Sequence, residues 1–401
     1  MDKVDSEGIE INRHADRIIG CIKGQQSGPT IVFFGGIHGN EPAGVSALHQ
    51  VVQEWQNKEA FIKGTIYAIS GNLWALERGE RYHKQDLNRL WTTDRLKKLK
   101  NGTLETENKD IEQMADIYNT IWQIINTENG PFYFMDLHTT SSRTIPFLTV
   151  NDSLLNRKFV VQYPAPIILG LEEYLDGPLL SYINELGYVS FGFESGHHTQ
   201  PESIDYHVAF IYLSLYFTGC INKDKVDIDR YYNILNSQTV ESRDIFEIYY
   251  KHTIKKDDAF EMKAGFDNFQ LVAKNQTIAT SNGKTLRAKK KGRIFMPLYQ
   301  NQGDDGFFAI RRIRSVYLHL SSVLRRIHFD RILHFLPGVR WASDTHDTLL
   351  VNRTIARFFT KKIFHLMGYR SRKLDKHHFI MKNREAASKT EAYKKAAWYN
   401  K

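Results

Sequence analysis

Apolar and polar positions along the first 243 residues follow two periods, one typical of buried strands and one typical of helices. Short apolar runs predict strands at residues 30–34, 64–70, 132–138 and 188–195. Apolar residues at helical spacing predict helices at residues 41–57, 105–127, 177–187 and 203–219. A polar loop is expected from the second strand to about residue 93. Because strands and helices alternate, the pattern favours an α/β domain, residues 1–243, with a mixed, largely parallel sheet and helices on both faces.

The pattern changes to short strand-like runs over residues 244–313, where we expect a small β-domain. Asn282-Gly283 lies between two of these runs. This dipeptide is a strong signal for a hairpin, because a type I′ turn needs positive φ at both central residues.

Residues 314–401 contain short basic runs with helical spacing, interrupted near Pro337-Gly338. We expect a basic, mainly helical C-terminal segment whose last dozen residues fray. The stretch 311–401 holds 21 Lys and Arg against 6 Asp and Glu, a net charge of +15, whereas the rest of the chain carries −6. Three interpretations follow, in order of preference: packing on the acidic part or on a second copy, peripheral contact with an anionic membrane through an amphipathic helix, and nucleic-acid binding. No groove-reading motif supports specific nucleic-acid binding.

Composition agrees with a soluble globular protein of more than one domain: 401 residues, 42% hydrophobic and 25% charged. The first residues are polar and lack the apolar core of a secretory signal. The most apolar stretch, residues 207–221, is shorter than the ~20 residues that a membrane span needs, so we expect a buried helix. Two cysteines, Cys21 and Cys220, cannot form a disulfide framework, which indicates a reducing compartment, the cytoplasm.

A candidate metal site follows from the motif HGNE, which places His38 and Glu41 three residues apart just after an apolar strand. His138, at the end of another strand, would complete a set of three ligands. Two imidazoles and one carboxylate leave a coordination position open, as in catalytic rather than structural zinc sites. Each residue alone has a simpler interpretation, a surface pair for His38 and Glu41 and a core histidine for His138.

A loop rich in charge, RYHKQDLNR, holds Arg81, Asn88 and Arg89 close to a strand end. A guanidinium offers a rigid fork of donors that suits a carboxylate or an oxyanion. The simpler interpretation is a solvated charged loop.

Glu194 ends the apolar strand of GFESGHH. A carboxylate beside a metal acts as general base on a water and then as acid to the leaving amine, although an exposed edge-strand Glu is the simpler interpretation. His197 and His198 are expected as loop residues at the entrance of the site rather than as ligands.

Taken in this order, HGNE, RYHKQDLNR, DLHTT and FESG resemble the succinylglutamate desuccinylase/aspartoacylase family, which belongs to the zinc carboxypeptidase-like hydrolases. The resemblance covers residues 30–196 best. It extends to residues 265–308, which look like the family's C-terminal β-domain.

The resemblance implies a role for each candidate: zinc ligands His38, Glu41 and His138, an oxyanion-stabilising Arg81, a carboxylate-binding pair Asn88 and Arg89, a general base Glu194, and an orienting Asp136. One feature departs from the family. Members that act on acyl-aspartate carry a further Arg shortly before the catalytic Glu, but residues 181–190 hold Asn184 and no Arg. This departure argues against a dicarboxylate substrate held by two arginines.

We therefore expect a zinc-dependent hydrolase, with one ion, that cleaves the amide bond of an N-acyl amino acid or a related small carboxylate-bearing molecule. Metal-activated water and the base Glu194 would perform the reaction. Two alternatives stay open. One is a carboxypeptidase-like enzyme on peptides, because Asn88 and Arg89 suit a C-terminal carboxylate equally well. The other is a binding or regulatory protein whose basic tail contacts an anionic membrane or nucleic acid. The acyl group, the leaving amine and the oligomeric state stay undetermined at this level.

Overall fold

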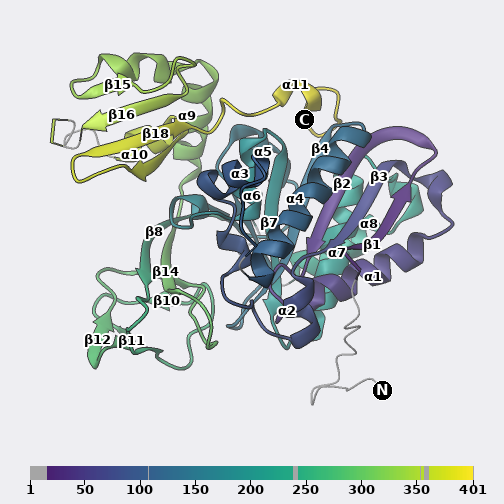
Figure 1. Cartoon of the computed structure of the whole chain (residues 1–401), viewed down its shortest axis with the longest axis horizontal. Coiled ribbons are helices and arrows are strands. Elements are labelled where there is room, and N and C mark those ends of the chain that lie inside the picture. The colour runs from purple at the N-terminus through teal and green to yellow at the C-terminus, as the bar shows by residue number, and fades with distance from the viewer. Residues whose placement is uncertain (1–15, 107, 238–242, 353, 356–360, 401) are drawn as a thin grey trace.

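The computed structural model describes residues 16–106, 108–237, 243–352, 354–355 and 361–400. An eleven-stranded sheet runs through most of the molecule, from the purple strands to the green ones (Figure 1). Its strands are β1 (Ile18–Lys23), β2 (Gln26–Gly35), β3 (Lys63–Ser70), β4 (Phe132–Thr140), β5 (Phe147–Val150), β6 (Ile167–Leu169), β7 (Val189–His197), β8 (Ile245–Thr253), β10 (Leu271–Val272), β13 (Gly292–Phe295) and β14 (Asp305–Arg312). Their lateral order is β1-β3-β2-β4-β7-β5-β6-β8-β14-β13-β10.

The sheet is mixed, as the sequence pattern predicts. Strands β3, β2, β4 and β7 are parallel neighbours, and so are β5, β6 and β8. The remaining pairs are antiparallel. Because β2, β4 and β7 lie side by side and run the same way, their carboxyl ends meet at one edge of the sheet.

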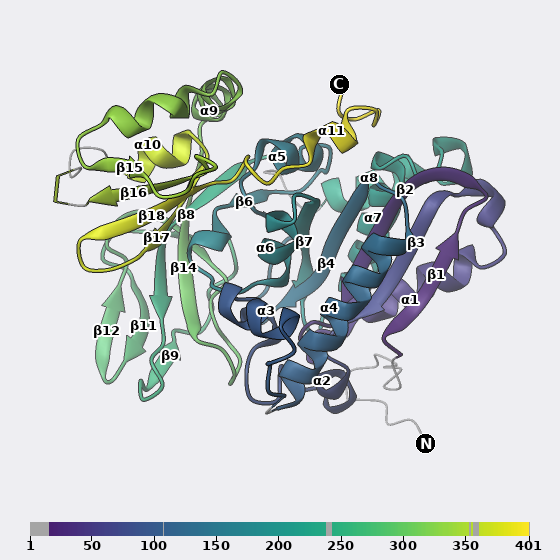
Figure 2. The ribbon, with the colours of Figure 1, turned by 45° about the horizontal axis from the view of Figure 1, so that its top comes forward.

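Helices cover both faces of this sheet (Figures 1 and 2). One face packs against α1 (Ala43–Trp55), α5 (Leu154–Val160), α7 (Glu202–Phe217) and α8 (Ile228–Asn236). The other packs against α3 (Thr93–Lys100), α4 (Lys109–Thr127) and α6 (Leu179–Glu185). Strand β2 serves both cores, because Ile31 and Phe33 point to the first face and Val32 and Phe34 to the second.

The expected polar loop after β3 contains one short helix, α2 (Leu73–Arg78), so that expectation is wrong in part, while α3 begins where the loop was expected to end. Helix α2 is too short and carries too few buried residues for the helical period to stand out. Asn72 caps α2 by accepting a hydrogen bond from the Ala75 N–H, and Gly79 ends it with a φ of 66°. The described residues also form short 3-10 helices: η1 (Glu59–Phe61), η2 (Leu87–Arg89), η3 (Leu171–Glu173), η4 (Lys223–Lys225) and η5 (Phe329–Phe335).

The sheet continues without a break into the stretch expected as a β-domain, because β8 pairs in parallel with β6. A second, three-stranded sheet joins β9 (Phe260–Met262), β11 (Thr277–Ser281) and β12 (Lys284–Arg287). The Asn282-Gly283 hairpin is confirmed, with φ of 50° and 72° between β11 and β12. The three domain boundaries themselves stay predictions.

The C-terminal segment is not mainly helical, which corrects the expectation. Helices α9 (Ser315–Arg326), α10 (Lys361–Leu366) and α11 (Thr390–Tyr393) accompany a four-stranded antiparallel sheet of β15 (Val339–Trp341), β16 (Thr348–Asn352), β17 (Tyr369–Lys373) and β18 (His378–Asn383). The strands are short, and basic residues such as Arg370 stand among the apolar ones. The alternation of apolar and polar residues that indicates a strand is therefore too short to be recognised in the sequence.

The expected fraying of the C-terminus is wrong for its described residues, which end at residue 400. Tyr393 and Trp398 are buried in the core that packs on α1 and α7. The Trp398 indole N–H donates to the Tyr133 hydroxyl at 2.9 Å. Figure 1 shows this end of the chain, the yellow segment, returning to the eleven-stranded sheet near β4.

Within the described residues no helix combines the length and apolarity needed to cross a membrane. Helix α7 holds the most apolar stretch and is buried, as expected. Cys21 and Cys220 form no disulfide, and the cytoplasmic location stays a prediction. The expectation for the N-terminal fifteen residues lies outside the described part of the chain.

Candidate active site

The carboxyl ends of β2, β4 and β7 carry the predicted site residues. His38 and Glu41 lie in the loop between β2 and α1, while His138 and Glu194 are register partners on β4 and β7. Gly39 allows the loop to pass close to α2: a Cβ there would lie 2.0 Å from the carbonyl carbon of Ala75. A strand-to-helix loop with a glycine between the two ligands therefore brings His38 and Glu41 to the same edge.

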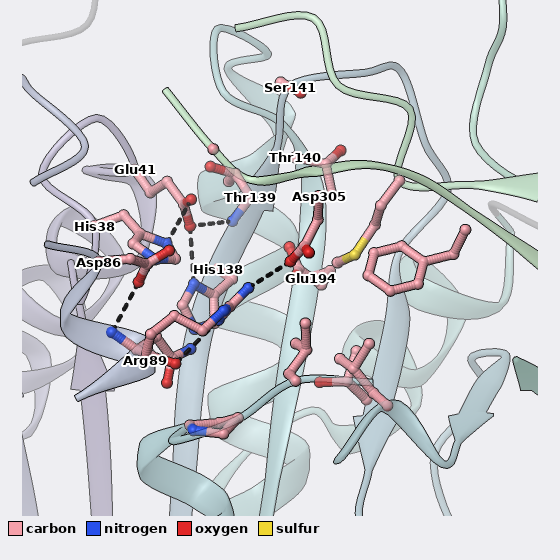
Figure 3. Close-up of a pocket in the computed structure, with 18 of the residues that line it drawn as sticks. His38, Glu41, Asp86, Arg89, His138, Thr139, Thr140, Ser141, Glu194 and Asp305 are labelled. Carbon is pink, nitrogen blue, oxygen red and sulfur yellow. Dashed lines mark hydrogen bonds and ion pairs between the residues drawn. The ribbon is translucent and has the colours of Figure 1, made fainter. Parts of the chain in front are cut away.

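The two imidazoles and the carboxylate converge, as the sequence predicts (Figure 3). Glu41 Oε1 is 2.9 Å from His38 Nδ1, and Glu41 Oε2 is 2.9 Å from His138 Nδ1. All three side chains are buried, and their ligand atoms lie within 4.8 Å of one another. The three groups are thus close enough to share one cation.

The outer nitrogen of each imidazole faces a second carboxylate. His38 Nε2 is 3.0 Å from Asp86 Oδ1, and His138 Nε2 is 2.7 Å from Asp136 Oδ2. A carboxylate in this place accepts the Nε2–H and leaves the Nδ1 lone pair directed at a metal. The structure brings Asp136 to its expected position. Asp86 was overlooked, although it stands in the RYHKQDLNR motif five residues after Arg81.

The donor set fits a divalent cation. Three carboxylates surround two imidazoles: Glu41 and Asp136, which are buried, and Asp86, which is half-buried. Burial alone would lower the pKa of His138, but Asp136 and Glu41 raise it well above its ordinary value. Carboxylates around two imidazoles favour bound positive charge, and two nitrogens with one carboxylate oxygen suit zinc.

Arg81 bridges two of these carboxylates, Glu41 and Asp86. Its Nη1 donates to Glu41 Oε1 and its Nη2 to Asp86 Oδ2, both at 3.2 Å. Its Nε is buried and has no hydrogen-bond partner among the described residues. Arg81 therefore lies beside the His38–Glu41–His138 cluster with one donor still free among the described residues.

Glu194 is buried beside the cluster and lines the same pocket. Burial raises its pKa to about 8, with Glu41 and Asp136 adding to the rise and His138 and Arg81 opposing it. Its Oε2 has no hydrogen-bond partner within the described part of the chain. A free, buried carboxylate oxygen with a raised pKa is suited to proton transfer.

Asn88 and Arg89, the predicted carboxylate-binding pair, both already contact other groups of the protein. Asn88 Oδ1 accepts a hydrogen bond from the Leu179 N–H at 2.9 Å. The Arg89 guanidinium forms an ion pair with Asp305, Nη2 to Oδ2 at 2.8 Å (Figure 3). Lys251 Nζ lies 2.5 Å from the other oxygen of Asp305. Asp305 begins β14, 216 residues along the chain, so no local pattern in the sequence indicated this partner.

The loop between β13 and β14 forms one wall of the pocket. Gln300 Oε1 accepts from Asn40 Nδ2 at 3.0 Å and lies 3.1 Å from His198 Nε2. His198 also contacts the Thr139 hydroxyl at 2.7 Å and lines the pocket, as expected. His197 instead contacts Thr199 and lies outside the pocket lining.

The pocket has a volume of about 160 Å³ and extends beyond the His38–Glu41–His138 cluster. Its far part is lined by apolar side chains, among them Val150, Leu171, Leu175, Leu180, Phe191 and Phe308. Asn184 stands near the position of the family's second Arg, and it does not line the pocket. Its amide donates to Leu180 O and Ser190 O inside the fold.

Comparison with known proteins agrees with these motifs. Residues 27–197 match the profile of the succinylglutamate desuccinylase/aspartoacylase catalytic domain. The succinylglutamate desuccinylase of Photorhabdus laumondii is 27% identical over 132 residues, 32% of this chain and 39% of that protein. That of Pseudomonas paraeruginosa is 34% identical over 70 residues, 18% of this chain and 21% of that protein. The chain thus matches less than half the length of these two curated relatives.

Solved structures share the fold. A succinylglutamate desuccinylase from Vibrio cholerae superposes with a TM-score of 0.53 at 15% identity, covering 72% of this chain and 83% of that one. A product-bound ectoine utilization protein, EutE, from Ruegeria pomeroyi gives 0.52 at 17% identity, covering 73% and 88%. At such low identity these likenesses establish the fold alone.

Proposed function

We propose that this chain, whose residues 27–197 match the catalytic-domain profile of the succinylglutamate desuccinylase/aspartoacylase family of hydrolases, is a zinc-dependent amidohydrolase. Its substrate is an N-acyl amino acid or a related small molecule that bears a carboxylate. The observation that carries the proposal is the buried cluster of His38, Glu41 and His138 beside the free oxygen of Glu194.

His38 Nδ1, His138 Nδ1 and the Glu41 carboxylate would hold the ion. A bound divalent ion supplies Lewis-acid chemistry, because it polarises a carbonyl and makes water more acidic. Asp86 and Asp136 keep the two imidazoles turned toward the centre by accepting their Nε2–H groups.

Glu194 moves the proton. Its Oε2 accepts a proton from the attacking water and delivers it to the nitrogen of the leaving amine, so that one carboxylate acts first as base and then as acid. The raised pKa of Glu194 supports this role, because a proton carrier works best when its pKa is near the working pH.

Arg81 and Arg89 each stabilise a negatively charged group of the substrate. Arg81 stabilises the oxyanion that develops on the scissile carbonyl, and preorganised donors of this kind lower a barrier by roughly 3–4 kcal/mol. Asn88 and Arg89 orient the carboxylate of the substrate, which takes the place of Asp305 on the Arg89 guanidinium.

Metal content tests the site directly. We expect one zinc per chain by elemental analysis of the wild type, a loss in His38→Ala, and an unchanged content in His319→Ala, an exposed histidine on α9. Wild-type protein that retains no stoichiometric metal would count against the proposal.

Glu194→Gln tests the proton transfer. The variant should keep its zinc and lose about 10²- to 10⁴-fold in kcat, whereas the exposed control Glu54→Gln should match the wild type. Turnover that survives in Glu194→Gln would exclude Glu194 as the base. Assays of N-acyl amino acids beside dipeptides and longer peptides separate this activity from a carboxypeptidase-like one.

A further inference from the structure

Helix α9 exposes a stripe of apolar side chains to the solvent. Four apolar residues at spacings of four, three and four, Val316, Leu320, Val323 and Ile327, occupy a stripe within roughly 60° of the helix circumference. All four side chains are exposed, and the exposed fraction of Ile327 is 62%. The buried residues of α9 are the polar Ser321 and Arg325. An amphipathic helix normally does the reverse.

Polar contacts hold α9 in this orientation. The buried Arg325 guanidinium forms an ion pair with Asp152, Nη2 to Oδ2 at 2.9 Å, and another with Glu385, Nη1 to Oε1 at 3.1 Å. Ser321 Oγ donates to Leu366 O at 2.7 Å. Rotating the helix to bury its apolar stripe would break all of these contacts and leave charges unpaired in the interior. The outward stripe is thus a fixed property of the fold.

The exposed apolar surface continues into η5. Phe329, Ile332 and Phe335 recur every third residue, which places them on one side of a 3-10 helix, and all three are exposed. The exposed fraction of Phe335 reaches 78%. We call these seven residues of α9 and η5 together the α9–η5 face. Figure 2 shows α9 at the outer edge of the molecule, close to α5.

Positive charge borders the α9–η5 face. Arg314, Arg326, Arg331 and Arg340 are all exposed. Between residues 314 and 340 the only acidic residue is Asp330, and it is buried, where it accepts hydrogen bonds from the Tyr369 hydroxyl and the Asn383 amide. The face therefore combines an apolar stripe with cations that no acidic residue of the same stretch offsets at the surface.

We propose that the α9–η5 face binds an anionic lipid bilayer, with its apolar side chains in the acyl boundary and its arginines at the headgroups. A helix of this kind lies in the interfacial plane and does not span the bilayer. Each Arg near an anionic surface adds attraction, while apolar residues set the depth of insertion. A second copy of the chain is a less suitable occupant, because pairing two such faces would bring their arginines together. The inference does not depend on the hydrolase activity.

Vesicle flotation of the full-length protein tests the proposal. Two probes are needed, vesicles of phosphatidylcholine alone and vesicles that also contain phosphatidylglycerol. We expect the protein to float with the second and much less with the first, and added salt to weaken the binding because it screens the arginines.

Single substitutions locate the contact. Ile327→Ser and Phe335→Ser should each lower the partition coefficient about tenfold, because each removes an apolar side chain from the bilayer. The matched control is Leu271→Ser on the far strand β10, whose exposed fraction of 56% is similar, and it should bind as the wild type does. Arg326→Gln and Arg331→Gln should each cost about fivefold on anionic vesicles, whereas the exposed Arg78→Gln should cost nothing.

Two results would overturn the proposal. One is a wild type that floats with neither kind of vesicle. The other is a Leu271→Ser variant that loses as much binding as Ile327→Ser. Light scattering adds a third arm: a dimer that Ile327→Ser dissociates, without vesicle binding, would assign the face to contact between copies instead.

Discussion

At the scale of single residues, the site is organised by carboxylates that stand behind other groups. Asp86 and Asp136 each accept from a histidine Nε2, and Asp305 accepts from Arg89. Burial alone would raise the pKa of Asp86, but His38, Arg89 and Arg81 hold it well below its usual range. The residues that contact an ion or a substrate therefore depend on a second set of charges for their orientation and availability.

Asp86→Asn tests this dependence at the metal. The amide can no longer supply the charge that orients His38, so the affinity for zinc should fall about 10- to 100-fold. Calorimetric titration of metal-free protein measures the change, with the exposed Asp94→Asn as control. An unchanged dissociation constant would contradict the role of Asp86.

Asp305→Asn tests the competition at Arg89. With the ion pair removed, a carboxylate-bearing substrate no longer displaces Asp305, and its KM should fall about tenfold while kcat stays within about twofold. Asp304→Asn, which alters the neighbouring residue of the same pocket, is the matched control. A KM that rises or does not move would show that the substrate carboxylate binds elsewhere.

At the scale of elements, segments far apart in the sequence are joined by a buried ionic cluster. Asp152, just before α5, pairs with Arg157 of α5 and with Arg325 of α9. Arg384, after β18, pairs with Glu172 and Glu173 of η3. Because Glu172 also lines the pocket, the C-terminal segment supports the wall of the candidate active site.

Asp152→Asn should therefore lower the free energy of unfolding by about 3–5 kcal/mol, because it leaves buried arginines without their partner. Urea unfolding measures the loss, and the exposed Asp224→Asn should change stability by less than about 0.5 kcal/mol. A loss no larger than that of the control would contradict the structural role of the cluster.

The cluster also predicts a pH dependence. Burial would raise the pKa of Asp152, but Arg157, Arg325 and Arg384 hold it far below its usual range. A depressed pKa stabilises the fold fully above the unfolded value of about 3.9, and this contribution is lost as the pH falls below it. Stability should thus decrease on acidification below about pH 4, and less steeply in Asp152→Asn. Equal slopes in the two proteins would contradict this assignment.

At the scale of the whole molecule, the end of the chain completes the core of the eleven-stranded sheet. Tyr393 and Trp398 pack against Tyr133 of β4, and the Tyr393 hydroxyl accepts from the Val189 N–H at 3.0 Å. The basic segment is therefore a structural part of the fold, which agrees with the first of the three interpretations of its charge. Membrane contact is an additional proposal that concerns a different face of the same segment.

Trp398→Ala should lower the free energy of unfolding of the whole protein by about 3–5 kcal/mol, because it opens a cavity in the main core. Phe335→Ala is the matched control, an aromatic residue of the same segment with a highly exposed side chain, and it should cost less than about 0.5 kcal/mol. A Trp398→Ala protein as stable as the control would mean that the C-terminus contributes nothing to the core.

The sequence by itself determined the α/β architecture and the three candidate ligands. Strand and helix periods are local, and His38, Glu41 and His138 stand beside strand ends that a parallel sheet must bring to one edge. The same reasoning placed Glu194, because it ends a strand that the apolar pattern identifies, whereas the role of Asp136 was implied by the family resemblance alone.

Only the tertiary structure decided the partners that lie far away in the sequence. The ion pair of Arg89 with Asp305, the outward orientation of α9 and the burial of Trp398 each join segments separated by more than 150 residues. A local pattern states which side chains are apolar or charged, but packing selects which of them meet. Arg325 shows the reason: a buried ion pair outweighed the helix's own apolar stripe, and that stripe was left facing the solvent.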